Sequence, residues 1–309
     1  MTQEMMQTYD RRLLQVAELD LVFMQYGVKR PIPARGGKSI QFRRFEKIDA
    51  TVGSYTLVEG TAPVETQATV SAVAATISQY GAYSKISDVL ETQAFDPVIA
   101  EFTEKYGIQA NEVLDGTVRD VLSGATTVQY ADIAIQVGTS GTGAVGSGNY
   151  LTAAELLEMK RTLRRNGARR INGAYVCLIH SDSTKALMED PDIRDDFRWT
   201  DPGAIKEGRI GRWMGIDFVE TNNLRVRSSY GMSGADIYEV LMFGDEFYGI
   251  SELSAQTLKM IVHPRGTGGH TDPLEQYSTV GWKAALAARI LNDNFGGIIY
   301  CASSRSNAA

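Results

Sequence analysis

Residues 48–84 read IDATVGSYTLVEGTAPVETQATVSAVAATISQYGAYS and are unlike the rest of the chain. The stretch contains no lysine or arginine, and its only charged residues are Asp49, Glu59 and Glu65. Threonine, valine, alanine and serine dominate it, which is typical of extended strands, and turn-forming residues gather at 59–63. The stretch therefore predicts a long two-stranded loop with its tip near residues 59–63.

Such a loop would make an isolated subunit prone to aggregation. Strand edges without charges pair readily with other chains, and a monomer normally guards them with lysines. Because residues 48–84 contain no lysine, we expect a neighbouring subunit to cover the loop.

The residues before the loop predict a helix, an arm and a strand. Apolar residues at helical spacing predict a helix over residues 3–26, which ends at Gly27. Residues 29–38 contain two prolines and two adjacent glycines and predict an extended arm, and residues 39–47 predict a strand. An arm of this composition cannot bury itself, so it also needs a partner surface.

A long helix is predicted after the loop, over residues 96–123. Asp96 is a good N-cap, Pro97 suits the first helical position, and Gly124 ends the helix. At 1.5 Å per residue the helix has a length of about 40 Å, which exceeds that of most helices in globular proteins.

The remainder of the chain predicts a compact α/β unit that follows a glycine-rich loop. A capping box from Thr152 to Glu155 begins a helix over residues 152–166. Ser181 is predicted to cap a short helix that ends near Pro191. Alternation of helices with apolar runs indicates a packed sheet with covering helices. The runs predict strands at 174–180, 212–220, 237–243, 256–263, 276–289 and 295–302.

Composition excludes several classes of protein. The chain has 309 residues, a formal net charge of −6, 43% hydrophobic residues and 22% charged residues, which argues against a disordered chain and against a dedicated nucleic-acid binder. No apolar run is long enough to span a membrane, and the N-terminus lacks the apolar core of a secretory signal, so we expect a cytoplasmic protein. Cys177 and Cys301 lie in apolar runs and are expected to be reduced thiols in the core.

Motifs of catalysis and cofactor binding are weak. Gly141, Gly143 and Gly146 match the glycine spacing of a dinucleotide site, but the next helix begins about six residues later, too far away to hold a pyrophosphate. His180 is followed by a serine, but neighbours in sequence do not make a catalytic triad, so a core or capping role is expected. We therefore expect no catalytic, cofactor-binding or metal-binding residues.

Two charged groups are candidates for contacts between subunits. Six positive charges lie within residues 160–170, and five carboxylates lie within residues 189–196. The basic group of one subunit can pair with the acidic group of the next. A solvated surface and a contact with DNA phosphates are the alternatives for the basic group.

Four short motifs mark the order of these parts. They are Leu57-Val58-Glu59-Gly60 at the loop tip, Tyr83-Ser84-Lys85-Ile86-Ser87-Asp88 and Phe95-Asp96-Pro97 before the long helix, and Val280-Gly281-Trp282-Lys283 near the end. In this order the chain resembles the major capsid proteins of tailed phages with the Hong Kong 97 fold, in particular the branch typified by the coliphage N4 capsid protein. The resemblance covers nearly the whole chain.

The resemblance implies an α+β, Hong Kong 97-like capsid fold. Residues 1–47 would form an N-terminal helix and arm, and residues 48–85 an extended β-hairpin loop that lies over a neighbouring subunit. A peripheral domain would comprise residues 86–150 and 273–309, with the long spine helix at 96–123. Residues 151–272 would form an α/β axial domain whose loops meet around the symmetry axes.

The resemblance also implies a structural function without enzymatic activity. The chain would self-assemble through hexamers and pentamers, in the host cytoplasm, into the icosahedral head shell of a virion. Its partners would be further copies of itself, scaffold, portal and decoration proteins, and packaged double-stranded DNA held without sequence specificity. The expected subunit-contact residues are Leu57, Val58, Glu59, Gly60, Arg43, Arg44, Arg164, Arg165, Asp195 and Asp196.

Some proteins of this fold form lysine–asparagine cross-links that start from the extended loop. Because residues 48–84 contain no lysine, we expect no cross-link from this loop.

Two other functions stay open from the sequence. An encapsulin-like nanocompartment shell would share the fold and hold cargo enzymes instead of DNA. An α/β enzyme that binds a phosphate ligand through residues 138–148 would leave residues 48–84 unexplained.

Overall fold

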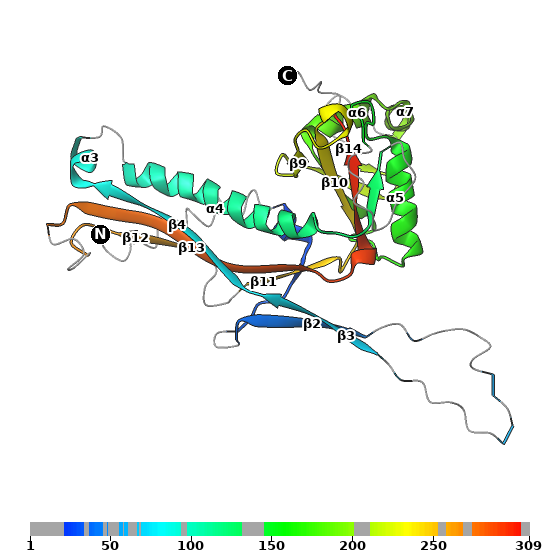
Figure 1. Cartoon of the computed structure of the whole chain (residues 1–309), viewed down its shortest axis with the longest axis horizontal. Coiled ribbons are helices and arrows are strands. Elements are labelled where there is room, and N and C mark those ends of the chain that lie inside the picture. Colours follow the sequence, from blue (N-terminus) through cyan, green and yellow to red (C-terminus); the bar gives the residue numbers. More distant parts are fainter. Residues whose placement is uncertain are drawn as a thin grey trace.

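A computed structural model describes residues 22–33, 37–45, 48, 56–57, 59–60, 67, 69–93, 98–131, 145–200, 211–252, 258–267 and 274–303. Figure 1 shows three parts, which we name the elongated layer, the compact unit and the hairpin stem. The compact unit lies at one end of the elongated layer, and the hairpin stem leaves the layer on the side opposite helix α4. The fold is mixed α+β, as predicted.

The elongated layer is a five-stranded sheet with a long helix along one face. Its central strand β13 is antiparallel to β4 along one edge, and β11 and β12 pair along the other edge. A short helix, α3 (Asp88–Gln93), follows β4. The strands are β1 (Val28–Lys29), β4 (Ser78–Ser87), β11 (Tyr248–Glu252), β12 (Lys259–His263) and β13 (Tyr277–Ile290).

The long helix α4 (Val98–Leu122) confirms the prediction for residues 96–123. Its predicted N-cap, Asp96, lies outside the described residues. One stripe at four-residue spacing is buried in the core shared with the sheet, and it consists of Ala110, Leu114, Val118 and Leu122. Trp282 of β13 donates a hydrogen bond from Nε1 to Gln109 Oε1 at 3.1 Å, which fixes the helix over the sheet.

Glycine at position 281 is required by the close approach of β13 to β4. A Cβ atom on Gly281 would lie 2.5 Å from the backbone oxygen of Ala82 and 2.7 Å from Cβ of Tyr83. On the partner strand, a Cβ atom on Gly81 would lie 2.7 Å from the backbone oxygen of Trp282. No side chain fits between the two strands at this point.

We expect Gly281→Val to lower the free energy of unfolding by about 3 kcal/mol, because the new side chain forces the two strands apart. Urea unfolding of the purified chain measures the change. The control is Thr279→Val on the same strand, where a β-branched side chain already fits. A Gly281→Val chain as stable as the Thr279→Val chain would contradict this account of the strand pairing.

The compact unit is a seven-stranded sheet, and its described residues include three α-helices. The central strand β10 (Ile237–Phe243) is buried along its whole length and is antiparallel to both β14 and β6. The other strands are β5 (Val128–Tyr130), β6 (Tyr175–Ile179), β7 (Arg212–Trp213), β8 (Ile216–Glu220), β9 (Val226–Arg227) and β14 (Gly296–Cys301). The helices are α5 (Ala153–Arg165), α6 (Ser181–Glu189) and α7 (Pro191–Thr200).

Helix α5 begins where the sequence predicts it. Thr152 and Glu155 form the predicted capping box. Buried Leu156, Met159 and Leu163 then pack in the core of the compact unit. None of the described helices is long and apolar enough to cross a membrane.

The cap predicted for helix α6 is wrong by one residue. His180, and not Ser181, is the N-cap, because its ring atom Nδ1 accepts the backbone N–H of Asp182. The ring also lies against Tyr238, with ring centroids 5.1 Å apart. This position confirms the capping role expected for His180.

Both cysteines are free and fully buried, as predicted. Burial raises the pKa of Cys301 to about 12 and also raises the pKa of Cys177. The two thiols therefore stay protonated in the core.

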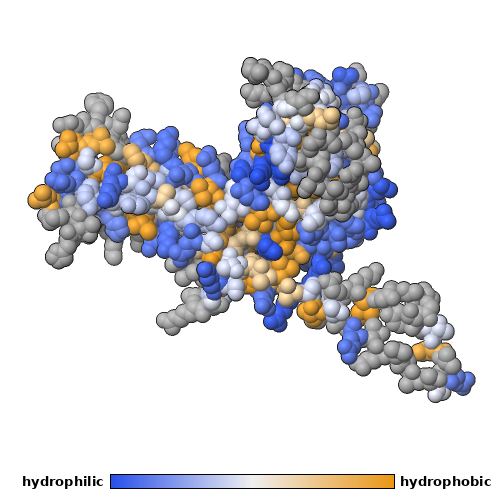
Figure 2. All heavy atoms as spheres, viewed as in Figure 1, coloured by the Kyte–Doolittle hydropathy of each residue, from blue (hydrophilic) through white to orange (hydrophobic). Residues whose placement is uncertain are grey.

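The hairpin stem consists of β2 (Ser39–Phe45) and β3 (Val70–Thr76). The two strands pair antiparallel, with Ser39 opposite Thr76 at one end and Phe45 opposite Val70 at the other. Its base packs against the sheet through a small apolar cluster of Ile32, Phe42, Ala75, Ile77, Ala285 and Ala287. Figure 2 shows apolar side chains gathered on the middle of the molecule, next to the base of the stem.

The sheets divide the chain differently from the predicted segments. Residues 78–85, expected at the end of the extended loop, lie in β4 of the elongated layer. Strands β11 and β12, within the segment 151–272, also pair in that layer, whereas β5 and β14 pair in the compact unit. Strand β14 pairs antiparallel with β10, and both strands are buried along their whole length. The C-terminal strand β14 is therefore part of the compact unit.

Candidate subunit-contact surfaces and the joint between the units

The hairpin stem carries Arg43 and Arg44 on the outside of the molecule. Both side chains are exposed, and they sit opposite Ala72 and Ser71 on β3. They line a cleft of about 90 Å³ between the stem and the body, together with apolar residues that include Phe42 and Leu291. The arginines are therefore placed where another chain can reach them.

The loop tip is exposed at each position that the structure describes. Leu57 has 72% of its surface exposed, and Glu59 and Gly60 form an exposed turn. Gly60 has a φ of 81°, a left-handed conformation that favours glycine. Val58 lies outside the described residues. An apolar side chain as exposed as Leu57 marks a candidate contact with another chain.

One member of the acidic group, Asp190, lies at the start of helix α5, and the basic group begins in the second half of the helix and continues past its end. Near its N-terminus, the Ala153 N–H donates to Asp190 Oδ2 at 2.8 Å. Beyond its C-terminus, Asn166 Nδ2 donates to the Asn294 backbone oxygen at 3.2 Å. The 13 residues of α5 separate these two ends by about 20 Å.

This separation bears on the predicted charge pairing. Arg164 and Arg165 are exposed in the last turn of α5, and Asp195 is exposed on α7. Asp196 also belongs to α7, but its side chain is outside the described part of the chain. Asp190 of the acidic group and the two arginines are therefore held about 20 Å apart along α5.

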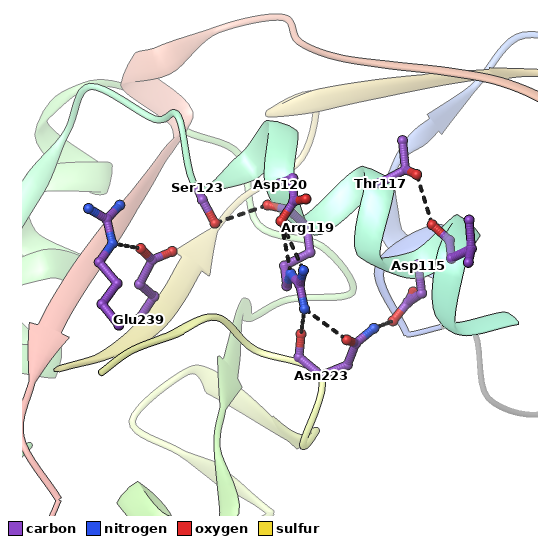
Figure 3. A network of polar contacts seen from close by, with 9 residues as sticks. Asp115, Thr117, Arg119, Asp120, Ser123, Asn223 and Glu239 are labelled. Carbon is purple, nitrogen blue, oxygen red and sulfur yellow. Dashed lines mark hydrogen bonds and ion pairs between the residues drawn. The ribbon is translucent and has the colours of Figure 1, made fainter. Parts of the chain in front are cut away.

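A buried carboxylate joins three distant parts of the chain, and Figure 3 shows its contact with one of them, Asn223. Asp115 of α4 is only 2% exposed. Its Oδ1 accepts the backbone N–H of Phe23, and its Oδ2 accepts from Asn223 Nδ2, each at 2.9 Å. Phe23 belongs to the short N-terminal helix α2 (Phe23–Tyr26), and Asn223 lies in the loop between β8 and β9 of the compact unit.

Arg119, one helical turn after Asp115, holds the other side of Asn223. Its Nη1 donates to Asn223 Oδ1 at 3.1 Å and to the Asn223 backbone oxygen at 3.3 Å. Burial raises the pKa of Asp115, while the hydrogen bonds from Asn223 and Phe23 and the charge of Arg119 lower it. We name Asp115, Arg119, Asn223 and Phe23 the joint.

The joint was missed from the sequence. Phe23 lies 92 positions before Asp115 and Asn223 lies 108 positions after it, so no local sequence pattern connects them. The one available signal is Asp115 itself, a carboxylate beside the apolar stripe of Leu114 and Val118.

A buried ion pair also holds β9 to β10 in the compact unit. Arg227 Nε donates to Glu239 Oε1 at 2.5 Å, and the Glu239 side chain has no exposed surface. Arg227 Nη2 donates to the hydroxyl of Tyr300, whose pKa burial raises to about 12. These contacts connect β9, β10 and β14 inside the compact unit, and among the described residues the other oxygen of Glu239, Oε2, is buried without a hydrogen-bond partner.

Among the described residues, no group of three histidine, cysteine, aspartate or glutamate residues could hold a metal ion. Gly141 and Gly143 of the glycine-rich loop lie outside the described part, and Gly146 donates its N–H to Asn149 Oδ1 in a local turn.

Comparisons with known proteins give one consistent result. A family model described as phage capsid protein matches residues 70–299. No curated protein matches the sequence. Among solved structures, the chain is similar to one in the capsid of the cyanophage P-SCSP1u, at 18% identity, with a TM-score of 0.70, over 92% of this chain and 89% of that chain.

Two further capsid structures have the same fold. For the capsid asymmetric unit of the cyanophage Pam1, the identity is 15% and the TM-score 0.72, over 88% of this chain and 87% of that chain. For the capsid of the Ralstonia phage GP4, the identity is 12% and the TM-score 0.70, over 94% of this chain and 93% of that chain. Nearly the whole fold is therefore shared, at identities too low to carry residue roles across.

Proposed function

Because this chain belongs to the phage capsid protein family, we propose that copies of it assemble through hexamers and pentamers into the icosahedral shell of a tailed-phage head. The chain is a major capsid protein, and its function is structural. The observation that carries this conclusion is the family match over residues 70–299, which covers most of both units.

We propose the Hong Kong 97 fold, in the N4-like branch, for this capsid protein. In this proposal α4 is the spine helix, the elongated layer is the peripheral domain and the compact unit is the axial domain. The assignment is supported by the long helix across a sheet and by the position of the compact unit at one end of it (Figure 1). It follows the observed sheets, so β5 and β14 go with the axial domain.

Two contacts between subunits are part of the proposal. The loop beyond the hairpin stem would lie over a neighbouring subunit, with Leu57, Val58, Glu59 and Gly60 at its tip and Arg43 and Arg44 at its base. Arg164 and Arg165 of one axial domain would pair with Asp195 and Asp196 of the next. A ring built from such head-to-tail contacts uses two different faces of each copy, and it closes when the rotation between copies allows.

The other expected partners belong to the same proposal. Assembly would take place in the host cytoplasm with a scaffold protein and a portal, and a decoration protein would add to the outer surface. The packaged double-stranded DNA would be held loosely, in keeping with the net charge of −6.

Nuclease treatment of purified particles tests the proposed content. Particles made in an infected host should protect genome-length DNA, and the DNA should be released when they are opened. Particles that enclose a protein cargo and no DNA would instead identify an encapsulin-like compartment.

The absence of loop lysines gives a further expected result. Because residues 48–84 contain no lysine, mature particles heated in detergent should run as a single band at the mass of one chain. Denaturing gel electrophoresis makes this measurement, with unassembled chain in the neighbouring lane. A ladder of covalent multimers would contradict the prediction.

A further inference from the structure

The joint is built around the side-chain amide of Asn223. An amide has a donor end and an acceptor end, and here each end has the complementary partner on α4. The donor Nδ2 points to Asp115 Oδ2, and the acceptor Oδ1 receives Arg119 Nη1. Asn223 is therefore held in one orientation by two side chains one helical turn apart (Figure 3).

The same contacts connect parts that otherwise belong to separate layers. Asn223 is in the compact unit, and Asp115 and Arg119 are in the elongated layer. Rotation of the compact unit about the end of α4 would break the bonds of Asn223 to both side chains together. The joint thus sets the angle between the two units more sharply than apolar packing, which has no direction.

The N-terminal segment is fixed at the same place. The Phe23 N–H donates to Asp115, its backbone oxygen accepts from the hydroxyl of Tyr248, and its side chain is fully buried. The arm therefore leaves the body from a point that is tied to the orientation of the two units.

We infer that Asn223, with Asp115 and Arg119, is a positioning residue for shell assembly: it fixes the angle between the compact unit and the elongated layer, and through that angle the curvature of the shell. The inference rests on the proposed function. Identical copies contact each other through both units, so a small change of angle in each copy adds up around a closed shell.

Exchanging the two side chains provides a test of this inference. Asn223→Asp places a second carboxylate against Asp115, and Asp115→Asn presents an amide to two donors, Phe23 and Asn223. Each single change breaks the match of donors and acceptors. The double variant Asp115→Asn/Asn223→Asp restores it, because the amide at position 115 then accepts from Phe23 and donates to the carboxylate at position 223, which still receives Arg119.

Two measurements distinguish an effect on the joint within one chain from an effect on shell assembly. In the purified unassembled chain, hydrogen exchange at the Phe23 amide should rise about tenfold in each single variant and return to the wild-type rate in the double variant. In assembled particles, electron microscopy should show one shell diameter for wild type and the double variant, but mixed diameters or open shells for Asn223→Asp. The matched control is Asp120→Asn, which alters an exposed partner of Arg119 and should leave both readouts unchanged.

Each outcome has a definite meaning. Uniform shells of wild-type diameter from Asn223→Asp, or failure of the double variant to restore uniform shells, would overturn the inference. If Asn223→Asp does not fold, Asn223→Ser takes its place, since it removes the amide without adding charge, and it should also give mixed diameters. If wild type forms no shells at all, the proposed function fails, and the exchange rates still report whether the joint exists.

Discussion

Replacement of residues 46–69 by an Asn-Gly turn is expected to leave a folded chain that forms almost no shells. Phe45 and Val70 are paired as the last residues of the hairpin stem, and Asn-Gly is the favoured two-residue connection for such a pair. The stem still packs through Phe42 and Ala75 against the sheet. The body therefore keeps its structure while the loop contact is removed.

The expected loss of assembly is large because, in the proposed shell, every copy loses the same contact. Each subunit in a shell is held by several contacts at once, and removal of one of them lowers the effective concentration that supports the others. We expect the yield of shells on a sucrose gradient to fall at least about 100-fold. Thermal unfolding of the unassembled chain should stay within a few degrees of wild type.

A single substitution within the intact loop provides the control. Gln67→Ala keeps the loop length and all four carboxylates of residues 46–69, and it should assemble as wild type does. Wild-type yields of shells from the shortened chain would show that the loop makes no contact needed for assembly.

Reversal of charge in the proposed pairing of α5 with α7 should have the next largest effect. We expect Arg164→Glu/Arg165→Glu to abolish shells, because in that pairing the new carboxylates would face Asp195 and Asp196 of the neighbouring subunit. Asp195→Lys/Asp196→Lys should fail in the same way. The chain that carries all four changes should assemble again, since its two faces are again complementary.

The four-residue exchange also separates contact from helix stability. Glutamates in the last turn of α5 oppose the helix dipole and cost up to about 1 kcal/mol each within one chain. The changes at 195 and 196 cannot repair that loss. Recovery of shells, measured by light scattering, would therefore report a contact between chains. The neutral variant Arg164→Gln/Arg165→Gln should lose less assembly than the reversal, and equal losses would contradict the proposed pairing.

Local signals in the sequence predict the elements well. The helix α4, the capping box of α5 and the buried strands β6 and β10 each follow from apolar spacing or from residues next to each other. The error at the start of α6 has a local cause as well, because a histidine ring nitrogen took the capping position in place of Ser181.

Pairing between distant strands could not be predicted in this way. The assignment of β14 to the compact unit depends on its pairing with β10, which lies about 60 residues earlier. An apolar run indicates a buried strand but not the strand with which it pairs. The joint has the same property, because Asp115 and Asn223 become neighbours only when the two units have folded. The family could be recognised from the sequence, whereas the contacts between the compact unit and the elongated layer are visible only in the structure.

Electron microscopy of the purified chain, at the concentration at which it is made in the host, tests most directly whether this subunit is built to be covered by its own copies. We predict closed shells of uniform diameter in which the loop of residues 46–69 lies on another subunit. A stable monomer, with that loop folded against its own elongated layer, would contradict the account.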